Sequence, residues 1–487
     1  MLKLVVFICG AVVMIFELVG SRMLGPYFGT SIFVWTSLIG IILGSLSVGY
    51  YIGGKLADQK PIIHYLSSII FLAALSIFFA LLIKDPLLVF LRNITLNDKI
   101  GSVFASIFLF FPASMLLGMV SPYAVKLTLH NLNTSGSTAG NLYALSTIGS
   151  IVGTFFAGFY LIPWFGTNSL LTILVIVLCA TSLLLERRFL GITLLLFTTF
   201  IASLFIIMDW SSIFKKNGVV DIDTTYNRIW IYDTKDTKTG EMVRKMGINN
   251  ENHSSMFLKS DELVNEYTKY YDMVRHFNPT FRKALMLGGG GYSYPKDYLR
   301  KYPENTIDVV EIDPAVTRLA KQFFNLKDNP RLRIYHEDGR THINRTRETY
   351  DVIFSDAFTS RYAVPYQLTT QEAIEKQYNI LNDGGLVILN IISALEGDNG
   401  KFLRAEYATY KQIFPQVYLF PVQSTDALEL QNIILVALKS NQKPLLTSTD
   451  QKIHGYLQHI WKSEIQEDMP ILTDDHAPVE YYINNII

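Results

Sequence analysis

Hydrophobic residues are concentrated in the first 210 positions of this chain, where they form long runs with few charges. A helix needs about 20 apolar residues to cross a membrane. About seven runs approach that length, at 4–19, 33–52, 65–83, 103–119, 142–162, 170–185 and 190–208. No small-residue cleavage site follows the first run, so it is not expected to be a removed signal peptide. The pattern predicts a multi-pass α-helical membrane domain over residues 1–210.

Two ionisable residues, Glu17 and Arg22, lie near the end of the first apolar run. A charged side chain inside a span is costly and often functional. One interpretation is a substrate or proton site within the helices. The other is a Glu17–Arg22 or interfacial ion pair that fixes the first helix, and the sequence favours this second interpretation.

The second half alternates short apolar strands with amphipathic segments. Residues 225–233 alternate as a strand does, and a polar turn at 233–240 predicts a hairpin. Helical periodicity follows at 260–277, so residues 211–280 are expected to form a small β unit with one helix. Strands are predicted in residues 281–487, at 284–287, 307–312, 332–335, 350–355, 386–391, 417–421 and 432–438. Strands that alternate with helices indicate a largely parallel, Rossmann-like sheet.

Composition narrows the function classes. The chain has 42 basic and 42 acidic residues, so its net charge gives no indication of nucleic-acid binding. Its two cysteines, Cys9 and Cys179, lie in apolar runs, which argues against a disulfide framework or a zinc site. The nine histidines show no metal-ligand spacing. We therefore expect no metal.

Glycines and acids follow the predicted strands. Gly288, Gly289 and Gly290, with Gly291 after them, end the strand at 284–287, and Glu311 lies at the end of the next strand. Asp338 and Asp356 follow the third and fourth strands. In an open α/β sheet, ligands bind at the carboxyl ends of the strands, where an acid holds ribose hydroxyls. The third glycine of the dinucleotide fingerprint is missing. The pattern therefore favours S-adenosylmethionine, or its decarboxylated form, over NAD.

The order and spacing of several motifs resemble the spermidine synthases, which are polyamine aminopropyltransferases of the class I methyltransferase-type fold. The matching pieces are Tyr226-Asn227-Arg228-Ile229, Asp261-Glu262-Leu263, Tyr270-Tyr271-Asp272, the four glycines, Val310-Glu311-Ile312-Asp313, Asp338-Gly339 and the segment 350–356. Residues 17–58 and 472–480 are similar to the membrane-fused branch of that family.

The resemblance implies a role for each matching residue. Glu311 would hold the ribose hydroxyls, Asp338 would accept from the adenine amino group, and Gly339 would give the adenine room. Gly288–Gly290 would lie under the methionine-derived tail, and Asn227 stands where the family has a cofactor-binding glutamine. Asp356 would be the catalytic base, and Tyr270 the active-site tyrosine. Tyr271, which replaces a histidine or glutamine, would contact the amine substrate.

The chain also departs from the family pattern. Gly291 stands where the family has an aspartate that binds the amine, and Thr359 replaces a second aspartate. Either the acceptor is different, or Asp474 and Asp475 replace the lost carboxylates as substrate-binding residues. The leading expectation is a membrane-anchored aminopropyltransferase acting on an amine such as putrescine. The alternatives are a methyltransferase for a membrane-associated acceptor and a nucleoside-binding transporter or sensor without turnover.

Localisation and partners complete these expectations. Basic residues are evenly divided between the two predicted sides of the membrane, so the positive-inside rule leaves the orientation undecided. We expect the catalytic domain in the cytoplasm, where its cosubstrate is made, and the helices in the cell membrane. The expected partners are a small amine and the lipid bilayer, without nucleic acid, and a homodimer is left open.

Overall fold

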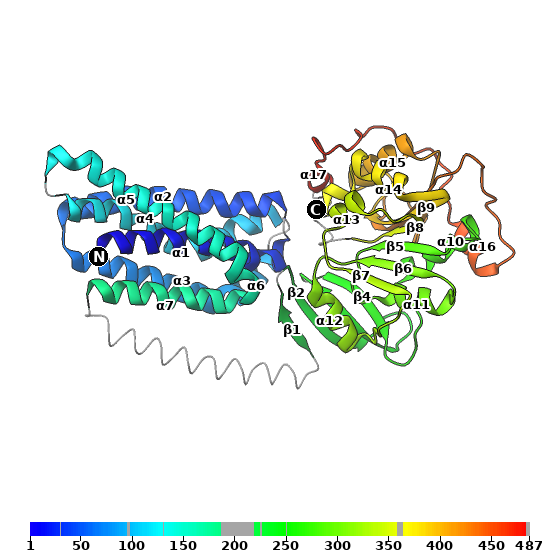
Figure 1. Ribbon diagram of the computed structural model, residues 1–487, viewed down its shortest axis with the longest axis horizontal. Helices are drawn as coiled ribbons and strands as arrows, with labels where there is room; N and C mark the ends of the chain where they lie inside the picture. Colours follow the sequence, from blue (N-terminus) through cyan, green and yellow to red (C-terminus); the bar gives the residue numbers. More distant parts are fainter. Residues whose placement is uncertain are drawn as a thin grey trace. The chain divides into compact units, whose positions relative to one another are not determined.

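The computed structural model describes residues 1–29, 31–94, 98–129, 131–186, 219–224, 226–249, 251–357 and 364–483. The chain divides into two compact units (Figure 1). One contains Met1–Asn217 with Asp223–Asn227, and the other contains Gly218–Ile222 with Arg228–Ile487. Each unit is described by itself below.

The first unit is a bundle of long apolar helices. It contains α1 (Leu2–Phe28), α2 (Ile32–Gln59), α3 (Ile63–Ile94), α4 (Asp98–Thr128), η1 (Leu132–Thr134), α5 (Ser135–Phe156), η2 (Ala157–Leu161), α6 (Ile162–Trp164) and α7 (Thr167–Leu185). Within the described residues, six helices are long and apolar enough to cross a membrane. They contain the first six predicted runs. The predicted span at 190–208 lies outside the described residues.

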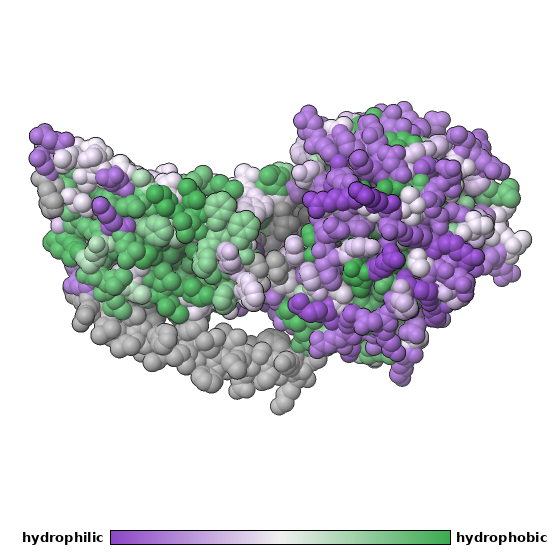
Figure 2. Space-filling view, in the orientation of Figure 1, coloured by the Kyte–Doolittle hydropathy of each residue, from purple (hydrophilic) through white to green (hydrophobic). Residues whose placement is uncertain are grey.

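Hydrophobic side chains cover the outer face of this bundle (Figure 2). Phe79, Phe108, Phe155 and Phe159 are among the large apolar residues that are more than half exposed. Glycines allow α1 and α5 to pack closely, because a Cβ on Gly149 would lie 2.1 Å from the Phe7 carbonyl oxygen. A buried seam and an apolar exterior are what a membrane-spanning bundle requires.

The second unit begins with a four-stranded sheet, which is larger than the predicted hairpin. Its strands are β1 (Val220–Asp223), β2 (Arg228–Lys235), β3 (Met242–Ile248) and β4 (Glu251–Phe257), in that order. The predicted helix at 260–277 begins only at Glu266, because Leu263 forms a β-bridge with Met256. It is divided into α9 (Glu266–Lys269), η4 (Tyr270–Met273) and α10 (Val274–Phe277).

A seven-stranded sheet forms the rest of the unit. Its strands are β5 (Lys283–Leu287), β6 (Thr306–Val310), β7 (Leu332–Tyr335), β8 (Tyr350–Ser355), β9 (Leu381–Ser393), β10 (Gln416–Pro421) and β11 (Gln431–Leu438). The order is β10-β11-β9-β8-β5-β6-β7. The sequence predicted all seven strands. The sheet is mixed, because β11 runs antiparallel to both β9 and β10.

Helices and short 3₁₀ turns accompany this sheet. They are α11 (Ser293–Lys301), α12 (Pro314–Phe323), α13 (Gly339–Arg345), η5 (Tyr366–Leu368), α14 (Gln371–Ile380), η6 (Asp398–Gly400), α15 (Lys401–Ile413), α16 (Gln451–Gln458) and α17 (Val479–Ile483). Along β5, Ala284 and Met286 join one buried cluster, whereas Leu285 and Leu287 join another. The sheet is therefore buried on both faces, which confirms the Rossmann-like prediction.

Candidate functional site

The glycine turn after β5 lies against the end of β8. Leu287 pairs with Ser355, and the Asp356 N–H donates to the Leu287 carbonyl at 2.9 Å. Gly288 has a φ of +92°, and a Cβ there would lie 2.4 Å from the Asp356 carbonyl oxygen. Both conditions require glycine. This contact brings the turn and Asp356 together at the carboxyl edge of the sheet.

Glu311 follows β6 and closes the turn from the other side. Its Oε2 accepts hydrogen bonds from the N–H groups of Gly289 at 3.0 Å and Gly290 at 3.2 Å. Its Oε1 accepts from the Asp313 N–H at 3.0 Å. Burial raises the pKa of Glu311, and these three bonds oppose that shift.

A carboxylate has about four acceptor positions. The three backbone bonds leave Glu311 room for one further donor. To bind both hydroxyls of a ribose, it would have to lose one of its three bonds to backbone N–H groups. Glu311 is thus placed as the sequence predicted, and its contact with ribose stays a prediction.

Asp356 is held by side chains from two other elements. Tyr267 of α9 donates from its hydroxyl to Asp356 Oδ2 at 3.0 Å, and Asn390 of β9 donates from Nδ2 to Oδ1 at 3.1 Å. The Tyr271 hydroxyl has no well-formed hydrogen bond within the described residues, but it lies near enough to help lower the Asp356 pKa.

Desolvation is the larger effect on Asp356. Although the residue retains some exposed surface, loss of hydration raises the pKa of its carboxyl from 3.8 to about 6, against the pull of Asn390, Tyr267 and Tyr271. A carboxylate with a pKa near 6 is a better proton acceptor than an ordinary aspartate, and it is still ionised at neutral pH.

The tyrosine that bonds Asp356 is therefore Tyr267, which the sequence analysis did not identify. Tyr270 bonds His459 instead, with 2.8 Å from its hydroxyl to Nδ1, and its ring stacks on Tyr456 at 4.4 Å. The rings of Tyr267 and Tyr271 lie together, with centroids 6.0 Å apart, whereas the Tyr270 ring packs against Tyr456. The catalytic role of Tyr270 stays a prediction, without a contact to Asp356 in its favour.

Asp338 and Gly339 begin α13. Asp338 caps the helix, since its Oδ1 accepts from the Thr341 N–H at 2.9 Å, and its Oδ2 faces Gln367 Nε2 at 3.4 Å. A Cβ on Gly339 would meet nothing closer than Leu368 at 3.4 Å, so the fold itself does not require glycine there. That freedom agrees with a glycine kept for a ligand, although contact with adenine is untested.

The space beside Gly291 is already filled. A Cβ on Gly291 would lie 2.8 Å from Ser254 Cβ and 3.0 Å from Phe324 Cδ1. Gly291 also donates its N–H to Ser254 Oγ at 2.7 Å. This packing leaves no room for a side chain, so the amine-binding aspartate that the resemblance implies would not fit at this position.

The other predicted residues lie elsewhere. Asp474 forms a two-point ion pair with Arg340, at 3.0 and 2.7 Å, and accepts from the Thr370 hydroxyl at 2.6 Å. Asp475 is exposed. Asn227 closes a turn with Thr224 in the segment Asp223–Asn227, which groups with the helical unit. Their ligand contacts stay predictions, and Thr359 lies outside the described residues.

Among the residues that the structure describes, no cluster of three or more His, Cys, Asp or Glu side chains could hold a metal ion. The described chemistry at the sheet edge is instead that of a buried carboxylate, two tyrosines and an amide beside a glycine turn.

Comparison with known proteins identifies the domain. Residues 266–444 match the spermine/spermidine synthase domain family. A polyamine aminopropyltransferase from Vibrio vulnificus is 31% identical over 169 residues, which are 34% of this chain and 54% of that protein. Polyamine aminopropyltransferase 1 from Streptomyces coelicolor is 22% identical over 73% of this chain and 69% of its own length.

Among solved structures, a probable spermidine synthase from Corynebacterium glutamicum is 23% identical. It aligns with 48% of this chain and 83% of its own chain at a TM-score of 0.41. The chain spans about half the length of the first curated relatives that it matches, between 54% and 57%.

Proposed function

Since the chain carries a spermine/spermidine synthase domain over residues 266–444, we propose that it is a membrane-anchored aminopropyltransferase. It transfers the aminopropyl group of decarboxylated S-adenosylmethionine to an amine such as putrescine. The observation that carries the proposal is the geometry of Asp356, a carboxylate with a pKa near 6 that is held beside the glycine turn by Tyr267 and Asn390.

The reaction needs a base to deprotonate the amine, but it needs no acid to protonate the leaving group. The amine nitrogen uses its lone pair to form a bond with the carbon next to the sulfonium. The C–S bond breaks, and sulfur keeps the electron pair and leaves as a neutral thioether. An alkyl amine has a pKa of about 10 and is mostly protonated at neutral pH. Asp356 attracts this ammonium and takes its proton, as a general base must.

The other residues hold the cosubstrate. The backbone of Gly288–Gly290 approaches its methionine-derived tail without a Cβ in the way, Glu311 accepts from the ribose, and Asp338 with Gly339 faces the adenine. Holding the amine in line with the C–S bond would supply much of the acceleration.

Methyl transfer to a membrane-associated acceptor is the second candidate, and the packing at Gly291 is what favours it. With Ser254 and Phe324 filling that space, the site no longer contains the carboxylate that a dicationic amine would need.

Product mass separates the two candidates. The purified full-length protein is incubated with putrescine and decarboxylated S-adenosylmethionine, and separately with S-adenosylmethionine and extracted membrane lipid and protein. Spermidine in the first reaction supports the proposal. A methylated product in the second, with no spermidine in the first, would replace it with the methyltransferase.

A further inference from the structure

Glu17 lies deep within an apolar helix. α1 has 27 residues, and at 1.5 Å per residue Glu17 is roughly 16 Å or more from either end. The hydrocarbon core of a bilayer is about 30 Å thick, so a membrane-embedded α1 places this carboxyl well inside it. A lone carboxylate at that depth is expensive, and such residues usually mark an ion or proton site.

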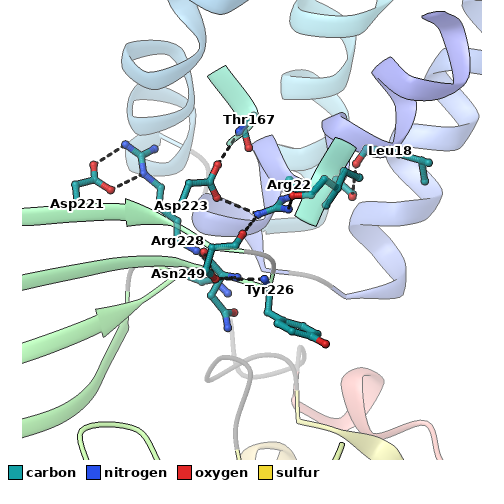
Figure 3. Close-up of polar contacts among 12 residues, drawn as sticks. Leu18, Arg22, Thr167, Asp221, Asp223, Tyr226, Arg228 and Asn249 are labelled. Carbon is teal, nitrogen blue, oxygen red and sulfur yellow. Dashed lines mark hydrogen bonds and ion pairs between the residues drawn. The ribbon is translucent and has the colours of Figure 1, made fainter. Parts of the chain in front are cut away.

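The ion pair expected with Arg22 is absent. Arg22 bonds Asp223 Oδ1 at 3.1 Å (Figure 3). It also donates to the Thr224 carbonyl, and to the Ile162 carbonyl at 3.4 Å. The two residues are five positions apart, which directs them to different sides of the helix. Within the described residues, Glu17 has no hydrogen bond or ion pair, and its side chain is half-buried.

A break in the neighbouring helix lies at the same height. α1 and α5 run parallel, because Ser150 Oγ bonds the Gly10 carbonyl, Gly153 packs on Ala11, and Ile162 meets Arg22. This alignment puts Glu17 level with the start of η2, the π-helical turn Ala157–Leu161. π-Turns inside helices are frequent at functional sites.

This turn frees a backbone carbonyl. The Ile162 N–H bonds the Ala157 carbonyl, five residues back. The next residue, Pro163, has no N–H, so the bond that would continue this register to the Gly158 carbonyl cannot form. Unsatisfied carbonyls of broken membrane helices are groups that coordinate cations.

We propose that Glu17 and the carbonyl groups of the η2 turn form a cation site within the helical unit. Its ligand is a singly charged cation, either a protonated amine or an alkali metal ion, that neutralises the carboxylate. This inference rests on the proposed membrane location and is independent of the proposed transfer reaction.

Carbodiimide labelling tests the site. Dicyclohexylcarbodiimide modifies protonated carboxyl groups in apolar surroundings, and mass spectrometry of the digested full-length protein in lipid nanodiscs locates the modification. We expect labelling of Glu17 at mildly acidic pH. It should fall about tenfold when a protecting cation reaches about ten times its dissociation constant. Propylamine, butylamine, sodium and potassium, which are all singly charged at this pH, are compared as the protecting cation.

Protection by the amines supports an organic cation, and protection by sodium or potassium alone supports a metal ion. Absence of labelling, or labelling that no cation reduces, overturns the site. Glu17→Gln should remove the labelled peptide, whereas Glu186→Gln, which alters a carboxylate bonded to His64 at the end of α7, should leave it. Extraction of the chain by alkaline carbonate would instead show that the membrane location has failed.

Discussion

At the residue scale, the site depends on which hydroxyl reaches Asp356. The sequence predicted that an aspartate, a tyrosine and a glycine turn lie together, but it identified Tyr270 as the active-site tyrosine. The 3₁₀ turn at Tyr270–Met273 and the short helix before it decide which tyrosine faces the sheet, and no pattern in the sequence specifies that rotation. Asn390 and Ser254 were missed for a similar reason, since they reach the site from strands distant in sequence.

Tyr267→Phe should move the pH profile of the reaction. Asp356 must be ionised to act as a base, so kcat/KM should fall as the pH drops through about 6. The Tyr267 hydroxyl stabilises the ionised form, and a hydrogen bond to a charged group is worth about 1.5–3 kcal/mol. Removal of this hydroxyl should raise the pKa that governs the acidic side of the kcat/KM profile by between about one and two units.

The matched control is Tyr270→Phe, because the Tyr270 hydroxyl bonds His459 instead. It should leave the acidic limb in place. Equal shifts in the two variants, or a shift only in Tyr270→Phe, would contradict the assignment of Tyr267.

Gly291→Ala should lower the melting temperature of the protein. The new Cβ would overlap Ser254 Cβ and Phe324, and overpacking of this kind costs about 1–3 kcal/mol. In Gly455→Ala, the added Cβ would meet nothing within 4 Å on α16, so its melting temperature should be unchanged or higher. If Gly291→Ala were as stable as wild type, the packing account of the missing aspartate would be wrong.

At the element scale, strands were easier to predict than their directions. β7 and β8 have the predicted bounds because each is a short apolar run between polar turns. The antiparallel direction of β11 depends on its pairing with both β9 and β10, which is a long-range choice that hydrophobic periodicity does not encode. The small β unit was underestimated because β1 has only four residues and β4, with the sequence Glu-Asn-His-Ser-Ser-Met-Phe, is mostly polar.

Asp474 fixes elements together, so its removal should affect stability more than amine binding. It joins Arg340 at the start of α13 to Thr370, the N-cap of α14. Asp474→Ala leaves the Arg340 side chain, which is 14% exposed, without this partner. The expected loss is about 1 kcal/mol, because Asp474 is 48% exposed, and it is read as a lower melting temperature with an unchanged KM for the amine.

The pH dependence follows from the same pair. The hydroxyl of Thr370 and the guanidinium of Arg340 lower the pKa of Asp474 against the effect of burial. Its stabilisation is therefore present above the ordinary aspartate pKa and is lost as the pH falls through the lowered value. Asp475→Ala, at an exposed position, should change neither the melting temperature nor the KM for the amine. If Asp474→Ala instead raised the KM for the amine and left the stability unchanged, Asp474 would be a substrate-binding residue.

At the scale of the whole molecule, the apolar helices and the transferase domain are separate units with separate predictions. His64 bonds Glu186 at one end of the bundle, whereas Arg22 and Thr167 bond Asp223 at the other end. The predicted span at 190–208 falls between Glu186 and Asp223 in the sequence, outside the described residues, and it stays a prediction.

The protein should behave as an integral membrane protein. Alkaline carbonate strips proteins that are held to a membrane by charge, but it leaves spanning helices in place. We expect the full-length chain in the membrane pellet after this treatment and in the soluble fraction only after detergent. Release by carbonate alone would contradict the proposed anchoring.

The most direct test of the account is the rate of aminopropyl transfer by Asp356→Asn, compared with its affinity for decarboxylated S-adenosylmethionine. Asparagine keeps the size of the side chain but cannot accept the amine proton. Loss of a positioned general base should lower kcat by roughly 10²–10⁴, while the dissociation constant of the cosubstrate changes little. A variant that binds the cosubstrate and transfers at the wild-type rate would show that Asp356 is not the base.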